Sequence, residues 1–158
     1  GTAAAVESTA AFLQRKIPDE ASAHLIDFGN YTTPEMMQQA YIADPEAFIK
    51  ETCRLDPPVT SATAPLKEPT AARLAGRDFF FEPGLLRQYV VSMANRDASV
   101  FENPSVFNPS RPNLNRNFTW NGSFGKGVDE NLYPRICPGR YLSLQISQAI
   151  INHFMGTS

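Results

Sequence analysis

The first third of the chain has the residue pattern of short helices separated by prolines. Residues 3–14 are rich in alanine and contain no helix breaker, so we expect a helix that begins close to the first residue. Two later segments, 34–40 and 45–55, each begin with a capping side chain, a proline and an acid in the first turn. This order favours a helix start, and Pro57 ends the second helix. A further short helix is expected over residues 19–28.

The middle of the chain shows little periodicity and predicts few regular elements. Residues 59–76 have the composition of irregular chain. Residues 79–81 and 88–92 are strand-like and flank Pro-Gly at 83–84, which is typical of a turn between two short strands. Residues 95–127 are rich in proline, glycine and asparagine. So long a run without helix or strand inside a compact domain is usually either functional or wrongly assigned.

Apolar residues return at helical spacing after Cys137, which indicates an amphipathic helix at the end of the chain. Pro138 takes the position that proline favours in a first helical turn. The apolar positions of this helix are Leu142, Ile146, Ala149, Ile150 and Phe154. The pattern as a whole predicts a mainly α-helical fold with small β elements, in one domain covering residues 1–158.

Composition narrows the class of protein. Hydrophobic residues make up 42% of the 158 positions and charged residues 19%, which is typical of a folded globular domain. The net charge of −2 gives no electrostatic attraction for nucleic acid, and no apolar run approaches the roughly 20 residues of a membrane span. The N-terminal segment has no basic leader, and two cysteines make a sparse disulfide framework, although one bridge between them stays open. A reducing compartment, the cytoplasm, is therefore expected.

Cys137 is the residue with the clearest candidate chemistry. A cysteine at the start of a helix lies next to free backbone N–H groups and the positive end of the helix dipole, which stabilise a thiolate. Arg135 adds a positive charge nearby. From this local chemistry alone, a small buried side chain and a reactive thiolate are equally open.

The residues around Cys137 resemble the haem-binding loop of the cytochrome P450 family. The chain reads FGKG at 124–127 and RICPGR at 135–140, and the family's pattern is F-G-x-G-x-R-x-C-x-G. The resemblance implies a haem b (iron protoporphyrin IX), with Cys137 as the metal ligand and Arg135 on a haem propionate. The other cofactor-binding positions that it implies are Phe124, Gly125 and Gly139.

This loop departs from the family's pattern in its length. Seven residues, Val128 to Pro134, stand where the pattern has one. Members of the family that consume hydroperoxides, such as allene oxide synthases and fatty-acid peroxygenases, also have lengthened loops here. The insertion leaves open whether Phe124 packs beside the sulfur.

Two further segments resemble the E-x-x-R and F-x-P-x-R motifs of the same family. The first places Glu51 and Arg54 three residues apart on one helix face, and the second ends at Arg111. The resemblance implies a structural network of Glu51, Arg54 and Arg111 that holds the irregular middle of the chain. An ordinary surface ion pair is the alternative for the first two residues. Cys53 occupies a variable position of the motif, so we expect it only to pack.

The sequence AAVEST at residues 4–9 resembles the family's distal-helix pattern, A-G-x-D/E-T-T. The resemblance implies that Glu7 and Ser8 relay protons to bound oxygen as an acid and a hydroxyl, with Thr9 as the third residue of this catalytic group. A solvated Glu7 and Ser8 in an alanine-rich helix is the alternative. The order of this segment relative to Glu51 favours the relay.

Together the four segments imply the haem-carrying part of a cytochrome P450 fold, incomplete because the N-terminal half and the last sheet segment are absent. The implied activity is that of a haem-thiolate monooxygenase, which uses O₂ to oxidise a small, apolar organic substrate. A ferredoxin or flavoprotein reductase would be its redox partner, with Lys126 and Arg140 on a basic docking surface. The alternatives are a peroxygenase or isomerase that uses hydroperoxides, and a non-catalytic haem-binding fragment.

Overall fold

Two compact units make up the chain. The computed structural model describes residues 1–18, 24–121, 124 and 136–156. The first unit consists of residues 1–60 and 91–158, and the second of residues 61–90. The expectation of one domain spanning residues 1–158 stays a prediction. Within the described ranges, no helix is long and apolar enough to cross a membrane.

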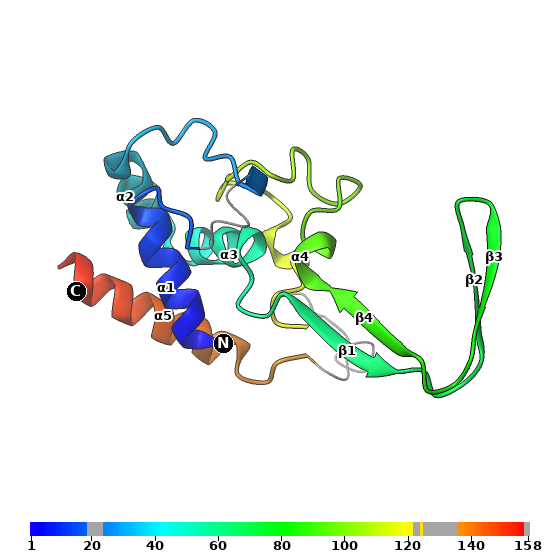
Figure 1. Ribbon diagram of the computed structural model, residues 1–158. Coiled ribbons are helices and arrows are strands. Elements are labelled where there is room, and N and C mark those ends of the chain that lie inside the picture. Colours follow the sequence, from blue (N-terminus) through cyan, green and yellow to red (C-terminus); the bar gives the residue numbers. More distant parts are fainter. Residues whose placement is uncertain (19–23, 122–123, 125–135, 157–158) are drawn as a thin grey trace. The chain divides into compact units, whose positions relative to one another are not determined.

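Helices make up most of the first unit, and their starts follow from the sequence. Thr33 accepts a hydrogen bond from the Met36 N–H (3.3 Å) and Asp44 accepts one from the Ala47 N–H (2.9 Å), so both side chains cap a helix. The three longer helices predicted before residue 56 are confirmed. The helical elements are α1 (Thr2–Leu13), α2 (Pro34–Ala43), α3 (Pro45–Leu55), α4 (Val91–Ala94), the 3₁₀ turn η2 (Leu114–Arg116) and α5 (Arg140–Met155) (Figure 1).

The helix predicted over residues 19–28 is wrong where the structure describes it. Residues 19–23 lie outside the described ranges, and residues 24–25 form a short 3₁₀ turn. Asp27 is extended, because its N–H donates to the Ser105 carbonyl (2.9 Å) and its own carbonyl accepts from the Phe107 N–H (2.7 Å). These bonds join segments far apart in the sequence and override the local helical preference.

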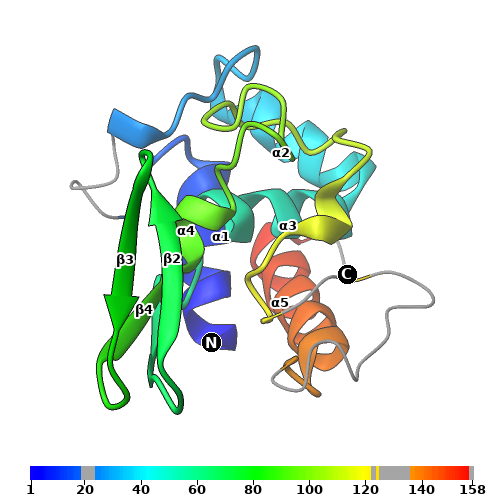
Figure 2. The same cartoon turned by 90° about the vertical axis from the view of Figure 1, so that its right-hand side faces the viewer.

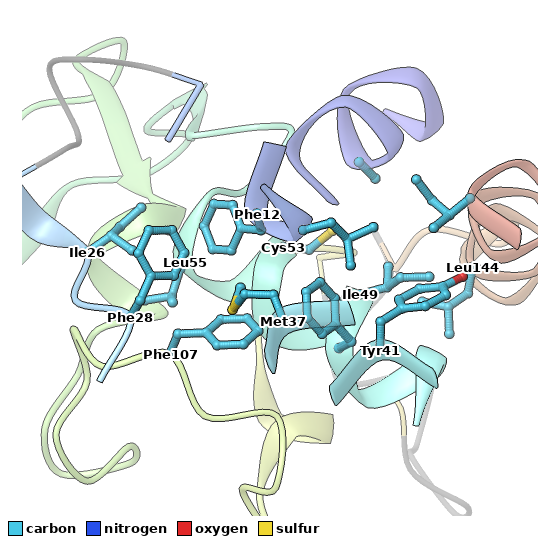
Figure 3. Packing of buried hydrophobic residues seen from close by; sticks show 14 of the residues in the cluster. Phe12, Ile26, Phe28, Met37, Tyr41, Ile49, Cys53, Leu55, Phe107 and Leu144 are labelled. Atoms are coloured by element: carbon cyan, nitrogen blue, oxygen red, sulfur yellow. The ribbon is translucent and has the colours of Figure 1, made fainter. Parts of the chain in front are cut away.

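The core of the first unit is centred on α3, which contacts α1, α2, α5 and η2 (Figures 1 and 2). Phe107 lies among four aromatic rings from different segments. The centroid distances from Phe107 are 5.1 Å to Phe48, 5.4 Å to Tyr31, 5.7 Å to Phe12 and 6.3 Å to Phe28. Figure 3 shows Phe28 and Phe107 towards one end of the core and Tyr41 with Leu144 at the other. The irregular segment that contains Phe107 is therefore an integral part of the core.

The second unit is made of two antiparallel sheets of two strands each. Its strands are β1 (Ser61–Pro65), β2 (Thr70–Leu74), β3 (Arg77–Phe81) and β4 (Leu86–Val90). Ser61 of β1 pairs with Val90 of β4, and Thr70 of β2 pairs with Phe81 of β3. In the sequence, the hairpin of β2 and β3 thus lies between β1 and β4, which pair directly with each other (Figure 1).

The strands predicted on either side of Pro-Gly at 83–84 are confirmed, but they do not pair with each other. The irregular chain expected over 59–76 is wrong, because β1 and β2 lie there. Ala75 and Gly76 form the turn between β2 and β3 with φ values of 49° and 79°. This turn lacks the asparagine or aspartate that usually marks a hairpin, so the hairpin was hard to predict from the residues alone. The strand predicted to residue 92 ends at Val90, where α4 follows.

The predicted C-terminal helix is confirmed as α5, but its buried side is not the one that the apolar pattern indicates. The buried positions are Arg140, Leu144, Ser147 and Ile151. Four of the five predicted apolar positions are large side chains that lie exposed, from 36% for Ile150 to 79% for Phe154. The helix also begins at Arg140, so Pro138 precedes it instead of lying in its first turn.

Replacing Phe107 by alanine should lower the free energy of unfolding by about 3–5 kcal/mol, because it leaves a cavity between four rings. Phe80→Ala is the matched control, since this ring is 80% exposed and its loss should change stability by less than about 0.5 kcal/mol. Denaturant unfolding of both variants measures the difference. Equal losses would contradict the placement of Phe107 in the core.

Candidate functional site around Cys137

A cavity of about 430 Å³ lies between the beginning of α1 and the beginning of α5, and Cys137 is part of its wall. Its volume is in the range of about 300–1,000 Å³ that is typical of cofactor and ligand sites. Most of its lining side chains are apolar or small. Its lining residues come from four parts of the chain: Gly1 with Thr2 and Ala5 of α1; Pro58 and Val59; Thr119, Trp120 and Asn121; and Cys137 and Gly139 with Leu142, Ser143 and Ile146 of α5.

Backbone hydrogen bonds hold Cys137 at the cavity. Its N–H donates to the Trp120 carbonyl (2.8 Å), and its carbonyl accepts from the N–H (3.2 Å) and the Nη1 (3.2 Å) of Arg140. Cys137 is half-buried and precedes α5 by three residues, so it lies just before the helix and not at its first residue. Both cysteines are free, which excludes the disulfide that the sequence left open.

Phe124 packs against Trp120, one of the residues that line the cavity. Its ring meets Trp120 edge-on at a centroid distance of 4.6 Å and Tyr141 at 5.4 Å. On another side, the Lys50 ammonium lies 4.5 Å from the centroid of the Phe124 ring. Phe124 thus supports Trp120, whose carbonyl binds the Cys137 N–H. Gly125, Lys126, Arg135 and the lengthened segment 128–134 lie outside the described residues.

Glu51 is a fully buried carboxylate that binds two arginines. Its Oε2 accepts from Arg54 Nε (2.7 Å) and its Oε1 accepts from Arg54 Nη2 (2.8 Å), which is a bidentate pair. Oε1 also accepts from Arg111 Nε (3.0 Å) and from the Asn108 N–H (2.8 Å). The three side chains expected to form a network therefore meet in one, which removes the alternative of a surface pair.

The two arginines extend this network to the irregular segment after α4. Arg54 Nη1 donates to the carbonyls of Asn95 (2.8 Å) and Pro104 (2.7 Å). Arg111 Nη2 donates to the carbonyls of Asn103 (2.8 Å) and Val106 (2.7 Å), and its Nη1 donates to the main-chain carbonyl of Glu102. Carbonyl groups that no helix or sheet satisfies are thus bound by guanidinium groups.

The three residues predicted as a catalytic group lie on different sides of α1. Thr9 is buried, and its Oγ1 donates to the Ala5 carbonyl one turn earlier (2.6 Å). Ser8 is also buried, at 6% exposure, and its Oγ donates to Asp56 Oδ2 (2.6 Å). Glu7 is exposed and lies about 200° around the helix from Ala5, the residue that lines the cavity.

Asp56 is a residue near this site that the sequence did not single out. It follows α3 directly, between the E-x-x-R motif and the prolines, and only the folded structure brings it to Ser8 across 48 positions. A signal existed in its place after α3, because an acid in this otherwise apolar stretch, Leu55 to Val59, has to find a polar partner.

Comparison with known proteins identifies the family. A sequence model described as Cytochrome P450 matches residues 13–156. The chain belongs to the cytochrome P450 family. It is 30% identical over 110 residues to cytochrome P450 98A1 of Sorghum bicolor, a match that covers 70% of this chain and 21% of that protein.

Solved cytochrome P450 structures share the fold. CYP150A6 of Mycobacterium marinum superposes with a TM-score of 0.67 at 22% identity, covering 98% of this chain and 31% of that one. The haem domain of a P450 from Tepidiphilus thermophilus gives 0.67 at 21% identity, covering 96% and 30%. The chain thus spans between a fifth and a third of the length of these relatives. The predicted P450-like fold is confirmed.

The residues around the cavity fit the haem that this family carries. The wall contains one thiol and mostly apolar side chains, as a flat apolar macrocycle with a thiolate ligand requires. A Cβ added at Gly139 would meet nothing within 4 Å, so the wall beside Cys137 is open. Among the described residues, no group of three or more His, Cys, Asp or Glu side chains could hold a metal.

Removing the central carboxylate of the network should be costly. Glu51→Ala leaves Arg54 and Arg111 buried without their counter-ion, which should lower the free energy of unfolding by about 3–5 kcal/mol. Glu46→Ala on the same helix is the control, because its pair with Lys50 is an i,i+4 pair with a 59% exposed carboxylate. That pair should contribute about 0.2–0.5 kcal/mol. Similar losses in the two variants, measured by denaturant unfolding, would contradict the network.

The two cysteines should differ sharply towards alkylation. Burial, with a smaller effect of Asp56, raises the pKa of Cys53 to about 12, whereas an unfolded cysteine titrates near about 8.5. Iodoacetamide should therefore modify haem-free protein at Cys137 and leave Cys53 intact until the protein unfolds. Added haemin should protect Cys137, as mass spectrometry can show.

Because the raised pKa of Cys53 belongs to the folded state, the stability that Cys53 contributes is complete below about pH 8.5 and is lost as the pH rises towards 12.

Proposed function

We propose that the protein to which this chain belongs is a haem-thiolate monooxygenase. It would insert one atom of O₂ into a small, apolar organic substrate, with electrons from a ferredoxin or a flavoprotein reductase. The observation that carries this proposal is the apolar cavity with Cys137 in its wall, opposite the hydroxyl-bearing helix α1. Family membership supports the same chemistry, since a thiolate ligand donates electron density to haem iron and favours O–O cleavage.

Each part of the site has a role in this proposal. Cys137 ligates the iron of haem b, and its carbonyl and N–H, bound to Arg140 and Trp120, fix its backbone. Phe124, Gly125 and Gly139 shape the loop around the ligand, and Arg135 pairs with a propionate. Ser8 and Thr9 hold hydroxyl protons on the side of α1 next to the cavity.

The lining of the cavity supports an apolar substrate. Ala5 and Val59 offer no hydrogen-bonding side chain, and neither do Leu142 and Ile146. Of the polar lining residues, Thr2 Oγ1 donates to Ser143 Oγ (3.1 Å), and Thr119 Oγ1 donates to the Cys53 carbonyl (2.7 Å). Few side-chain partners are thus left for a buried polar group of a substrate. We also propose a cytoplasmic location, supported by two free cysteines, which a reducing compartment maintains.

The ferrous–CO absorption spectrum of the full-length protein tests the ligand. A thiolate ligand should give a red-shifted Soret band, which Cys137→Ala should abolish. Cys53→Ala is the matched control, because Cys53 lies in the core and should leave the band in place apart from a loss of stability. A band that survives Cys137→Ala would contradict the assignment.

The source of oxygen tests the activity. With O₂ and an electron donor, the wild-type protein should oxidise an apolar substrate and incorporate one ¹⁸O atom from ¹⁸O₂. Turnover with hydroperoxides alone would instead support the peroxygenase or isomerase that the lengthened loop suggested. Failure to take up haem would support the non-catalytic fragment.

A further inference from the structure

A short hydrogen bond joins the distal helix to the end of α3. Ser8 Oγ donates to Asp56 Oδ2 over 2.6 Å, a length typical of an O–H group bound to a charged carboxylate. Ser8 is buried on α1, while Asp56 is half-buried. The pair therefore joins a buried hydroxyl to a residue that is partly exposed at the surface.

The backbone holds the Asp56 carboxylate in its place. The Asp56 N–H donates to the Thr52 carbonyl (2.7 Å), and the preceding carbonyl of Leu55 accepts from Arg96 Nη2 (2.7 Å). Burial and the charge of Arg54 lower the pKa of Arg96, and the negative charges of Asp56 and Glu51 oppose that shift. Hydrogen bonds thus hold the backbone on both sides of the peptide bond between Leu55 and Asp56.

Both ends of this bond adjoin the cavity that contains Cys137. Ala5, one turn before Ser8 on α1, lines the cavity, and so do Pro58 and Val59, which follow Asp56. The bond therefore ties two walls of the cavity to each other. Glu7, the acid next to Ser8 in the sequence, is exposed on the far side of the helix from Ala5.

We propose that Asp56, and not Glu7, is the carboxylate that serves the distal hydroxyl. Asp56 acts through Ser8 as a positioning residue. It orients the Ser8 hydroxyl and replaces each proton that Ser8 passes into the cavity with one taken from solvent water. One proton enters at Asp56 and one leaves at Ser8, so the charge of the pair is unchanged. This inference rests on the proposed monooxygenase.

The coupling of electrons to product in the full-length holoenzyme tests the role of Asp56. With O₂ and an electron donor, Asp56→Asn should lower the product formed per electron about tenfold, less than the roughly 10²–10⁴-fold of a group that transfers the proton itself, because Asp56 acts through Ser8. Hydrogen peroxide should rise in proportion, while peroxide-driven turnover, which needs no added protons, should stay near that of the wild type. Asp56→Glu should restore part of the coupling.

The matched control is Glu35→Gln, an exposed acid in the first turn of α2, which should leave coupling unchanged. Wild-type coupling in Asp56→Asn would overturn the inference, and so would a loss of coupling in Glu7→Gln alone. If the wild-type protein forms no product from O₂, the proposed function fails and this role fails with it. An uncoupled Asp56→Asn beside a coupled wild type supports both.

A second measurement needs neither haem nor turnover. In haem-free protein, the shifts in melting temperature of Ser8→Ala and Asp56→Ala should not add in the double variant, because each substitution removes the same hydrogen bond. Additive shifts would show that the two side chains do not interact, which would overturn the inference. This cycle separates the existence of the pair from the activity of the enzyme.

Discussion

The buried carboxylate of Glu51 is the interaction on which the rest of the first unit depends. It is the shared counter-ion of Arg54 and Arg111, whose side chains both lie almost wholly out of solvent. Burying three charges costs desolvation, and the cost is tolerable only because every partner is in place. Through the two guanidinium groups, this one carboxylate also fixes the backbone between α4 and η2. The same backbone brings Phe107 into the core and leads on to Trp120, which holds Cys137 at the cavity.

Support for the cysteine therefore comes from three separate parts of the sequence. Phe124 packs edge-on against Trp120, whose carbonyl binds the Cys137 N–H. Lys50, from the same helix as Glu51, lies over the ring of Phe124. Ala5 and the Ser8–Asp56 bond close the other side. Such an arrangement gives a thiolate a fixed, mostly apolar surrounding, and this is the condition in which an axial ligand can tune a haem.

Local signals predicted the elements whose ends are set by neighbouring residues. The caps at Thr33 and Asp44 placed α2 and α3, and the resemblance to the E-x-x-R and F-x-P-x-R motifs indicated the network of Glu51, Arg54 and Arg111. Long-range contacts explain the failures. Asp27 is extended because it pairs with residues almost eighty positions away, and β1 finds its partner only after a whole hairpin. The buried side of α5 could not be read from its own apolar pattern, since neighbouring helices decide which side is covered. Asp56 was overlooked because its partner lies on another helix.

The guanidinium groups bind main-chain carbonyls, and carbonyls are present whatever side chain a residue carries. The path of the chain from residue 95 to residue 106 is thus set without reference to most of its side chains. Such a segment can exchange many residues in evolution and keep its course, provided that the two arginines and their carboxylate persist. It can therefore present a new surface to a new partner while the cavity that contains Cys137 stays the same.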